Sequence, residues 1–340
     1  MQVKHFTIPI FIPQLACPNA CVFCNQRSIS GFLKEPSPGE ILQIINNHFK
    51  TIPKENSYIE IGFFGGSFTG LPIIDQENYL KIVQPFIESG AVRGIRLSTR
   101  PDYINENVLE LLKKYHVTTI ELGAQSVDDE VLKLSGRGHT SWQIAEASRL
   151  IKQKGFSLGL QMMIGLPGDT LDKSIGTAKS IVDLGADNTR IYPTLVITET
   201  ELENLYNNGK YVPLSLDEAI GWTKEMYKIF EKGNVKILRI GLHPSEGLIN
   251  RKKLVAGPFH VSFGELVMTA MWKESFQQLH EKNPKGTLYE NIIISVPHGQ
   301  LNCAIGYKAS NKKLLQQNYK NVKFITDALL QGRNFHADYC

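Results

Sequence analysis

The 340-residue sequence predicts an α/β fold with a parallel β-sheet, followed by a smaller α/β segment. One observation leads to this prediction. Short runs rich in Ile, Val, Phe and Leu alternate six times with stretches of helical periodicity up to about residue 195. Parallel strands need crossover connections, so this alternation indicates repeated βα units. Six units suit either a partial (βα)6 barrel or an open doubly wound sheet.

The predicted strands are short, and turn residues bound each of them. In chain order they are Phe6–Ile12, Tyr58–Phe64, Gly94–Ser98, Val117–Leu122, Leu158–Ile164 and Thr189–Tyr192. The predicted helices are Pro38–Phe49, Asp75–Ile87, Asn105–Tyr115, Asp128–Leu134, Ser141–Lys154 and Thr170–Leu184. Capping residues at Ser37 (with Glu40), Asn105 and Thr140 or Ser141 support the helix starts. Gly155 and Gly185 support two of the helix ends.

The alternation changes beyond residue 200, so we expect a domain of residues 1–245 and an extension of residues 246–340. Before the boundary we expect a helix and loop over Glu199–Lys210, a helix over Leu216–Glu231 and a strand over Lys236–Ile240. After it we expect a helix over Phe263–His280 and then a strand, helix, loop, helix and strand. These last elements are Asn291–Val296, Gln300–Ile305, Asn311–Tyr319 and Asn321–Thr326, with the loop between the two helices.

Composition limits the class of protein. The hydrophobic content of 42% and charged content of 21% are typical of a soluble globular protein. There is no apolar run of about 18 residues and no signal-peptide pattern, so no membrane span is expected and the cytoplasm is the expected location. Residues 285–340 hold seven Lys or Arg and three Asp or Glu, an excess equal to the whole chain's +4. This basic segment can attract a polyanion, or it can simply be a solvated surface.

Three cysteines, Cys17, Cys21 and Cys24, follow the first predicted strand with C-x3-C-x2-C spacing. Cysteine thiolates are the usual protein ligands of iron–sulfur clusters, and a [4Fe–4S] cube has four irons to ligate. Three thiolates leave one iron open to a substrate or cofactor. A zinc site would need a fourth ligand at short spacing, which is missing. A disulfide is disfavoured because the other cysteines are only Cys303 and Cys340.

Glycine-rich and polar motifs follow the later strands at their carboxyl ends, where α/β proteins of either type place their sites. These motifs are Gly65-Gly66-Ser67, Thr99-Arg100-Pro101-Asp102, Gly123-Ala124-Gln125-Ser126, Gly165-Leu166-Pro167-Gly168 and Tyr192-Pro193. A glycine at such a place lets the backbone approach a ligand closely, although it can also serve only a tight turn.

The cysteine motif, with Phe23 before its third cysteine, resembles the radical S-adenosylmethionine (SAM) superfamily. Over about residues 3–245 the chain resembles the radical SAM domain of the elongator catalytic subunit (Elp3) family. The motifs that carry this resemblance are Ser98–Tyr103, Glu121–Val127 and Arg137–Thr140. It implies a partial (βα)6 TIM-like radical SAM barrel, with SAM chelated to the open iron of a [4Fe–4S] cluster. It further implies an enzyme in which the reduced cluster cleaves SAM to a 5′-deoxyadenosyl radical that takes a hydrogen atom from the substrate.

The resemblance implies that glycines surround the cofactor. Cys17, Cys21 and Cys24 are matched to the cluster ligands. Gly65 and Gly66 match the pair that meets the SAM amino group, where a side chain would block the ligand.

The resemblance also implies polar contacts with SAM. Gln125 matches a ribose-contacting residue of the related coproporphyrinogen oxidase-like enzymes. Arg137 matches their partner of the SAM carboxylate, a role that suits a guanidinium fork. Gln161 stands where those enzymes carry an aspartate facing adenosine, and because the amide replaces an acid, Gln161 is equally well an ordinary polar strand residue. Ser98 stands where those enzymes often carry glutamate, which is a second departure. Gly165 is expected beside adenine.

Two residues are expected on the substrate side of the barrel. Arg100 can pair with a substrate phosphate or carboxylate, or it can form a salt bridge with Asp102. Tyr192 can stack on a base or pack at the barrel rim. Single histidines such as His139 and His243 are expected to be structural.

The final segment resembles a KH-type core, in which a G-x-x-G loop between two helices clamps nucleic-acid backbone. Here the loop reads Gly306-Tyr307-Lys308-Ala309, with alanine in place of the second glycine. Lys308, Lys312 and Lys313 would contact phosphates. A structural cap on the barrel is the alternative.

These observations lead to three hypotheses. The first is a radical SAM enzyme that modifies RNA, with tRNA the candidate substrate, and that receives electrons from a donor such as ferredoxin or flavodoxin. The second is a radical SAM oxidoreductase on a small metabolite, and the third is a cluster-bearing RNA-binding protein without turnover. The Elp3 family normally continues into an acetyltransferase domain that supports wobble-uridine modification in tRNA. No Gly-rich pyrophosphate loop of that domain follows residue 200, so we expect an Elp3-like protein lacking it.

Overall fold

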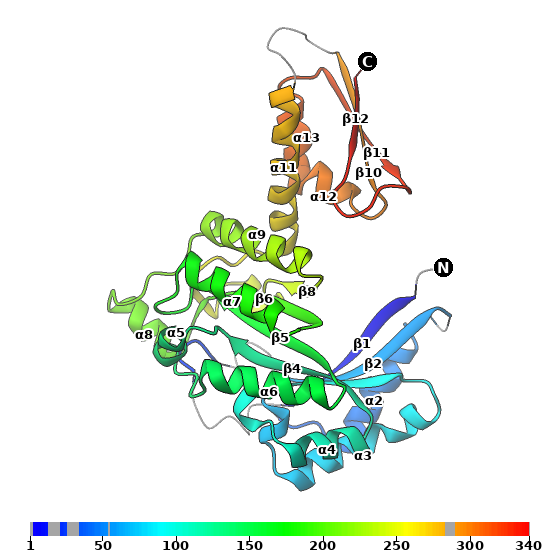
Figure 1. Cartoon of the computed structure of the whole chain (residues 1–340), viewed down its shortest axis with the longest axis vertical. Coiled ribbons are helices and arrows are strands. Elements are labelled where there is room, and N and C mark those ends of the chain that lie inside the picture. The colour runs from blue at the N-terminus through cyan, green and yellow to red at the C-terminus, as the bar shows by residue number, and fades with distance from the viewer. Residues whose placement is uncertain (1–2, 13–20, 26–33, 54, 283–289, 340) are drawn as a thin grey trace. The chain divides into compact units, whose positions relative to one another are not determined.

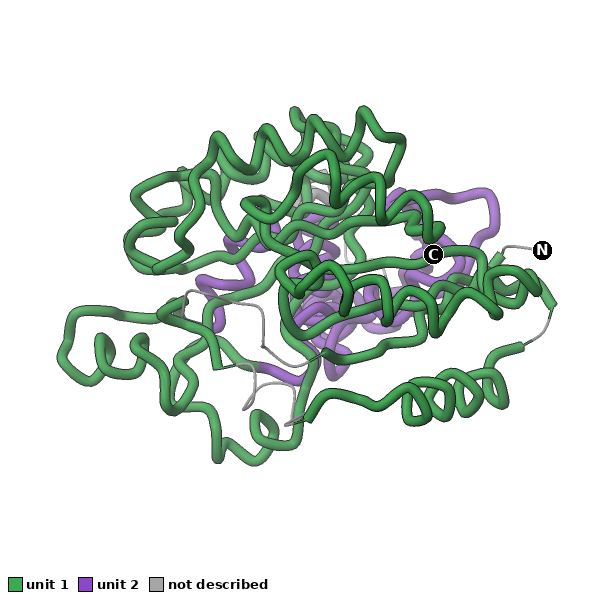
Figure 2. Tube along the Cα trace, turned by 90° about the horizontal axis from the view of Figure 1, so that it is seen from below, with its two compact units in different colours: residues 1–215, 226–259 green, residues 216–225, 260–340 purple. Residues whose placement is uncertain are grey.

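The computed structural model describes residues 3–12, 21–25, 34–53, 55–282 and 290–339 (Figure 1). The chain forms two compact units. The first contains residues 1–215 and 226–259, and the second contains residues 216–225 and 260–340 (Figure 2). None of the described helices combines the length and apolar character needed to cross a membrane.

The first unit is built on a seven-stranded parallel sheet that curls into a half-barrel (Figure 1). Its strands follow one another in the order β1 (Lys4–Phe11), β2 (Ser57–Phe64), β3 (Gly94–Thr99), β4 (Val117–Gln125), β5 (Ser157–Ile164), β6 (Asn188–Pro193) and β8 (Lys236–Ile240). The predicted partial barrel is therefore confirmed. The sequence had predicted β8 as a strand without assigning it to this sheet, and it adds a seventh member beside β6.

Helices cross over between the strands, close to where they were predicted. They are α2 (Pro38–Phe49), α3 (Ile73–Glu88), α4 (Glu106–Lys114), α5 (Asp129–Leu134), α6 (Ser141–Gln153) and α7 (Leu171–Asp183). Capping boxes begin α2, where Ser37 and Glu40 bond reciprocally, and α6, where Thr140 pairs with Gln143. Asn105 caps α4 by accepting from the Val108 amide. The short turns η1 (Phe68–Gly70) and η2 (Pro101–Tyr103) follow β2 and β3.

The two faces of the sheet differ because side chains alternate along each strand. On β4, Ile120 and Leu122 are fully buried on the face that the helices cover, and Glu121 between them lies on the inner face. On β2, Glu60 alternates with Ile61 in the same way. The apolar face forms the core with the helices, while the inner face carries charged side chains.

The rest of the first unit lies near the carboxyl ends of the strands. It includes an antiparallel pair, β7 (Val196–Ile197) with β9 (Leu254–Ala256), and the helices α8 (Glu201–Asn207) and α10 (Glu246–Ile249). A small apolar core of Leu195, Ile197 and Leu248 holds this region together. Helix α9 (Leu216–Lys232) contributes residues to both units.

The second unit packs helices against a three-stranded sheet of order β11-β10-β12. Its elements are α11 (Phe263–Lys282), β10 (Asn291–Pro297), α12 (Leu301–Ile305), η3 (Tyr307–Ala309), α13 (Ser310–Leu315), β11 (Asn321–Asp327) and β12 (His336–Tyr339). Strands β10 and β11 are parallel, and β12 runs antiparallel to β10. The predicted order of strand, helix, loop, helix and strand is present. Strand β12 was not predicted from the sequence, and α13 ends four residues earlier than predicted.

Candidate functional site

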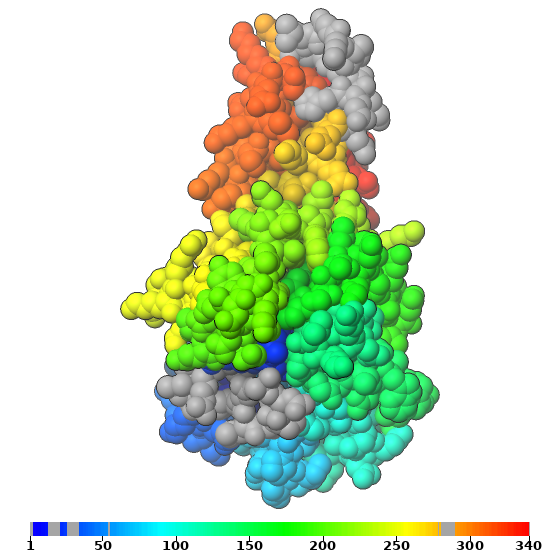
Figure 3. All heavy atoms as spheres, turned by 90° about the vertical axis from the view of Figure 1, so that its left-hand side faces the viewer, coloured from blue at the N-terminus to red at the C-terminus, as the bar shows by residue number. Residues whose placement is uncertain are grey.

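The cysteine loop is anchored by backbone hydrogen bonds at the carboxyl end of the half-barrel. Cys17 lies outside the described residues. Cys21 is 7% exposed and Cys24 is partly exposed, and the Cys24 amide donates to the Cys21 carbonyl over 2.9 Å. The Val22 amide donates to Ser135 O after α5, while Val22 O accepts from the Leu202 amide in α8. Figure 3 shows blue N-terminal atoms at the surface between teal and yellow-green segments.

Arg137 links the cysteine loop to the end of β4. Its Nη1 donates to Cys21 Sγ over 3.1 Å, and its Nη2 donates to the Gly123 carbonyl. The side chain is 7% exposed, and its Nε has no partner among the described residues. The Nε–H group of Arg137 is therefore still available to donate to an anion.

Arg100, which is paired with Asp102, binds the backbone carbonyl of Arg137. The Arg100 fork pairs with Asp102 through two bonds of 2.9 Å, and Arg100 Nη2 also donates to the Arg137 carbonyl over 2.5 Å. Arg100 is only 3% exposed. Of the two roles expected for it, these contacts favour the salt bridge with Asp102, and its substrate contact stays a prediction. Its visible effect is to position the backbone of Arg137.

Gln125 ends β4 in an unusual backbone conformation. Its φ is +69°, in the left-handed region that a non-glycine residue seldom adopts, and the β4–β5 register shifts just before it. The side-chain Oε1 is buried without a partner among the described residues. A Cβ on Gly123 would come within 3.0 Å of Gln125 Nε2 and 3.3 Å of Arg137 Nη2. Gly123 therefore leaves room for the side chains of Gln125 and Arg137, and both have polar atoms that can bind a ligand.

The glycine pair after β2 adjoins a cleft. Gly65 has φ +108°, and a Cβ there would lie 2.6 Å from the Ile12 carbonyl oxygen, so no other residue fits. Gly66 lines a small, shallow cleft at the ends of β1 and β2. The other residues that line it are Ile12, Phe63, Phe64, Ser67, Phe68 and Leu71.

Gly165 turns the chain after β5. Its φ is +73°, its amide donates to Asp169 over 2.8 Å, and its carbonyl accepts from the Tyr211 hydroxyl over 2.6 Å. Burial raises the pKa of the Asp169 carboxyl, although the bonds from Ser174 and Gly165 oppose that rise. A Cβ on Gly165 would collide with Leu214 at 2.9 Å. Packing alone explains this glycine, and its place beside adenine stays a prediction.

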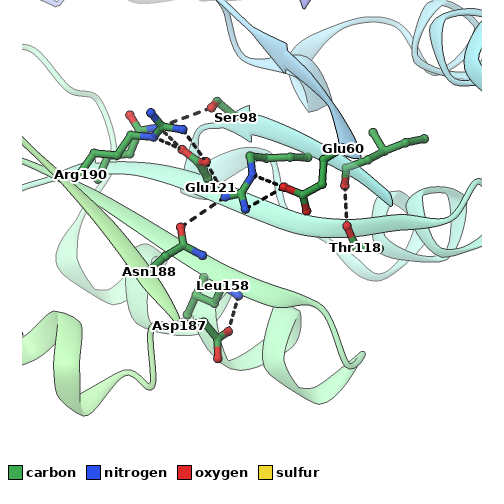
Figure 4. A network of polar contacts seen from close by, with 11 residues as sticks. Glu60, Ser98, Thr118, Glu121, Leu158, Asp187, Asn188 and Arg190 are labelled. Carbon is green, nitrogen blue, oxygen red and sulfur yellow. Dashed lines mark hydrogen bonds and ion pairs between the residues drawn. The ribbon is translucent and has the colours of Figure 1, made fainter. Parts of the chain in front are cut away.

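A buried ionic network surrounds Glu121 on the inner face (Figure 4), and Gln161 is hydrogen-bonded to it. Gln161 Nε2 donates to Glu121 Oε2 over 2.8 Å and approaches Ser98 Oγ at 3.4 Å. Glu121 also accepts from Arg96 Nη1 over 2.7 Å and from Arg190 Nε over 2.7 Å. The bonds made by Gln161 are those of a polar strand residue, and its contact with adenosine stays a prediction.

The network extends across five strands and was not foreseen from the sequence. Arg96 also pairs with Glu60 at 3.2 Å, and the Arg190 guanidinium lies 5.5 Å from the centre of the Phe64 ring. Burial opposes ionisation of Glu121, but the bonds and charges of Arg190 and Arg96 outweigh it and lower the pKa of the carboxyl. The sequence signal that could have indicated this network is the presence of charged residues, such as Glu60 and Glu121, between apolar residues of the strands.

Tyr192 lies on the inner face two residues beyond Arg190. Burial raises the pKa of its hydroxyl, while the positive charges of Arg190 and Arg239 oppose that rise. Its hydroxyl therefore stays protonated at neutral pH. Stacking on a substrate base stays a prediction.

His139 is a buried neutral side chain. Burial and the positive charges of Arg137 and Arg100 lower its pKa to about 3. Its Nε2 lies 3.4 Å from the Ala124 carbonyl, and its Nδ1 has no partner among the described residues. Neither atom contacts a candidate metal ligand.

In the second unit, Lys308 occupies the loop between α12 and α13, while Lys312 and Lys313 lie in α13. Lys308 (φ +52°) and Ala309 (φ +59°) both adopt the left-handed conformation that favours glycine. Ala309 occupies the position of the second glycine in the KH pattern. The Lys308 ammonium lies 5.4 Å from the Tyr307 ring centre. The structure therefore has a sharp loop with cations near it, and phosphate contact stays a prediction.

These residues fit a cluster and SAM. Two thiols of the motif, those of Cys21 and Cys24, lie at the strand ends. The space that a Cβ on Gly65 would need is filled by the Ile12 carbonyl, so this glycine is required by a tight turn, and its contact with SAM stays a prediction. Buried polar atoms without partners, Arg137 Nε and Gln125 Oε1, lie close to the Cys21 thiol or to Gly123. Buried polar groups normally find partners, so these atoms indicate a polar ligand. Within the described ranges, no three metal-ligating side chains come together, since Cys17 is outside them.

Comparisons with known proteins agree with this geometry. Residues 11–181 match the model of the radical SAM superfamily, and residues 186–273 match that of the radical SAM C-terminal domain. A tRNA uridine(34) acetyltransferase of Methanocaldococcus jannaschii is 28% identical over 288 residues, covering 78% of this chain and 52% of that protein. Elongator complex protein 3 of Saccharomyces cerevisiae is 31% identical over 162 residues, covering 47% of this chain and 27% of that protein.

A solved structure shares the fold. The archaeal Methanocaldococcus infernus Elp3 with an N-terminal deletion superimposes with a TM-score of 0.66 at 24% identity, covering 81% of this chain and 64% of that one. The chain thus spans about half the length, or less, of the curated relatives named above.

Proposed function

This chain belongs to the radical SAM superfamily, and we propose that it is a radical SAM enzyme that modifies RNA, with tRNA as its substrate class. The superfamily uses a [4Fe–4S] cluster and SAM, and the reduced cluster, when bound, supplies the electron that cleaves SAM to a 5′-deoxyadenosyl radical. The relatives described as elongator complex protein 3 and tRNA uridine(34) acetyltransferase support the RNA substrate.

In this proposal Cys17, Cys21 and Cys24 hold the cluster, and Arg137 orients SAM. The observation that carries the assignment is the position of Arg137, which touches Cys21 Sγ and Gly123 O and keeps a buried Nε without a partner in the described chain. A fork held at that point can bind a carboxylate next to the cluster, because guanidinium and carboxylate match in geometry and charge.

The other residues of the site shape the space around SAM. Gly65 and Gly66 are proposed to meet the SAM amino group through their backbone, and Gly66 lines the cleft at this place without a side chain. Gln125, with its unpartnered Oε1, is placed to accept a hydrogen bond from a ribose hydroxyl. The inner face of the half-barrel would keep water away from the reaction, because a buried site excludes competing hydrogen donors.

The second unit is proposed to dock the RNA. Its cations Lys308, Lys312 and Lys313 cluster at one sharp loop and the helix after it. Lysine side chains bind phosphate as point charges and give affinity without reading the base sequence. The electron donor would be a protein of the ferredoxin or flavodoxin kind.

The test is an anaerobic reaction of the reconstituted protein with SAM, dithionite and total cell RNA. We expect RNA to accelerate the release of 5′-deoxyadenosine, and mass spectrometry of the digested RNA to show a nucleoside of changed mass. RNA that has been digested with nuclease beforehand should not accelerate the release.

Replacing Lys308, Lys312 and Lys313 together with alanine provides the matched variant for this assay. It should raise the RNA concentration needed for half-maximal rate and leave the slow release without RNA unchanged. If RNA has no effect on 5′-deoxyadenosine release while a protein-free, RNA-free metabolite extract accelerates it, the substrate is a small metabolite and the RNA proposal is wrong.

A further inference from the structure

We propose that Arg239, His243 and Tyr192 form an anion subsite at the carboxyl ends of β6 and β8, which takes a phosphodiester of the RNA beside the reacting nucleotide. The inference rests on the proposed RNA substrate. It concerns residues that neither the cysteine motif nor the SAM-binding motifs include.

The strand register places Arg239 on the inner face of the half-barrel. Arg239 on β8 is paired with Arg190 on β6, and residues in register on neighbouring parallel strands point to the same side of a sheet. Arg190 points inward, since it contacts Glu121 and lies over the ring of Phe64. Tyr192 is on the same side as Arg190, two residues further toward the carboxyl end.

Arg239 differs from the other arginines of this face in its charge balance. Arg96 pairs with Glu60 and Glu121, and Arg190 pairs with Glu121. Arg239 forms no ion pair within the described part of the chain. Its Nε donates to the Gly241 carbonyl over 3.1 Å, and its Nη2 lies 3.0 Å from His243 Nδ1. The inner face therefore has a positive charge without an acidic partner at this point.

The contact with His243 fixes which hydrogen atoms the pair can offer. A guanidinium only donates, so His243 Nδ1 must accept, and the proton of the neutral ring is on Nε2. The subsite then presents the remaining N–H groups of Arg239, the His243 Nε2–H group and the Tyr192 hydroxyl. Such a set of donors suits a phosphate, and the planar fork of arginine can bind it through two bonds.

The turn after β8 holds these donors in place. Gly241 has φ +81°, and its amide donates to Ile191 O on β6 over 2.9 Å. This bond ties the turn that carries His243 to the strand that carries Tyr192. Arg239 is partly exposed and His243 is exposed, so a phosphate can reach them without unfolding of the sheet.

The experiment compares tRNA binding by the reconstituted protein with that of Arg239→Gln, Arg239→Lys and Arg93→Gln across a salt series. Arg93 is an exposed arginine just before β3, at the amino ends of the strands, and serves as the matched control. Arg239→Gln should weaken binding several-fold and reduce the slope of log K against log salt by about 0.7–0.9, the value for one phosphate contact. Arg239→Lys should keep most of that slope, and Arg93→Gln should match the wild type.

A second probe separates failure of the subsite from failure of the RNA proposal. The ³¹P resonance of uridine 5′-monophosphate should broaden when the nucleotide binds to the wild type. The Arg239→Gln variant should not cause this broadening. If tRNA binds, but Arg239→Gln leaves the salt slope or the probe signal unchanged, the subsite is wrong and the RNA proposal stands. If tRNA is not bound but the probe requires Arg239, the anion subsite stands and the RNA substrate is wrong.

Discussion

Replacing Cys21 with alanine is expected to abolish the iron–sulfur absorption of the reconstituted protein and reduce SAM cleavage to background. Of the two thiols of the motif that the structure describes, Cys21 is the buried one, and Arg137 contacts it. Its loss would leave two thiolates for a cluster that needs three here. The loss of metal affinity and activity in Cys21→Ala should exceed the roughly 10–100-fold loss that follows when a residue hydrogen-bonded to a metal ligand is removed. Iron content and 5′-deoxyadenosine release measure it.

Cys303→Ala is the matched control for this change. Cys303 lies in the second unit, and burial raises the pKa of its thiol, which makes it a poor metal ligand. The control variant should bind as much iron as the wild type. Full iron content in Cys21→Ala, or an equal loss in both variants, would contradict the assignment of the cluster to the cysteine motif.

Replacing Glu121 with alanine is expected to destabilise the half-barrel by about 3–5 kcal/mol, the usual cost of breaking a buried ion pair from one side. Glu121 is fully buried and accepts bonds from Arg96, Arg190 and Gln161. Arg96 would keep Glu60, whereas Arg190 would lose the carboxylate that neutralises it. The free energy of unfolding in a denaturant titration measures the effect. Glu146→Ala, on the exposed surface of α6, should leave this free energy unchanged.

The variant Glu121→Gln gives the pH dependence of the same contribution. Because the folded state lowers the pKa of Glu121 below its ordinary value of 4.5, the carboxylate stabilises the fold fully above that pH. The stabilisation is lost as pH falls through the lower, folded-state pKa. The wild type should therefore exceed Glu121→Gln in stability at neutral pH, and the difference should shrink in acid. A difference that stays constant from neutral pH into acid would contradict this.

The sequence predicted the frame of the half-barrel well because local signals agree with the tertiary structure there. The capping box of Ser37 and Glu40, the cap at Asn105 and the capping box at Thr140 begin helices where expected. The position of β8 could not be foreseen, because strand pairing depends on contacts between distant segments. The edge strand β12 was missed for the same reason, since its four residues pair only with β10.

The side-chain contacts of the site were harder to predict than its location. The motifs placed Gln125 at the end of β4 and matched Arg137, in a later motif, to the partner of the SAM carboxylate. Only the structure shows that Arg137 touches Cys21 Sγ. Arg100 and Asp102 are two positions apart, and the structure shows that their pair also holds the Arg137 carbonyl. Glu121 and Arg190 are 69 residues apart, so no local pattern could have paired them.

The most direct test of the cofactor site is the electron paramagnetic resonance spectrum of the reduced, reconstituted protein with and without SAM. We predict four irons per cluster, as in a cube, and a change of the spectrum when SAM is added, since SAM binds the open iron. Arg137→Gln should keep the iron and need more SAM for the same change. Zinc in place of iron, or a wild-type spectrum that SAM leaves unaltered, would contradict the account.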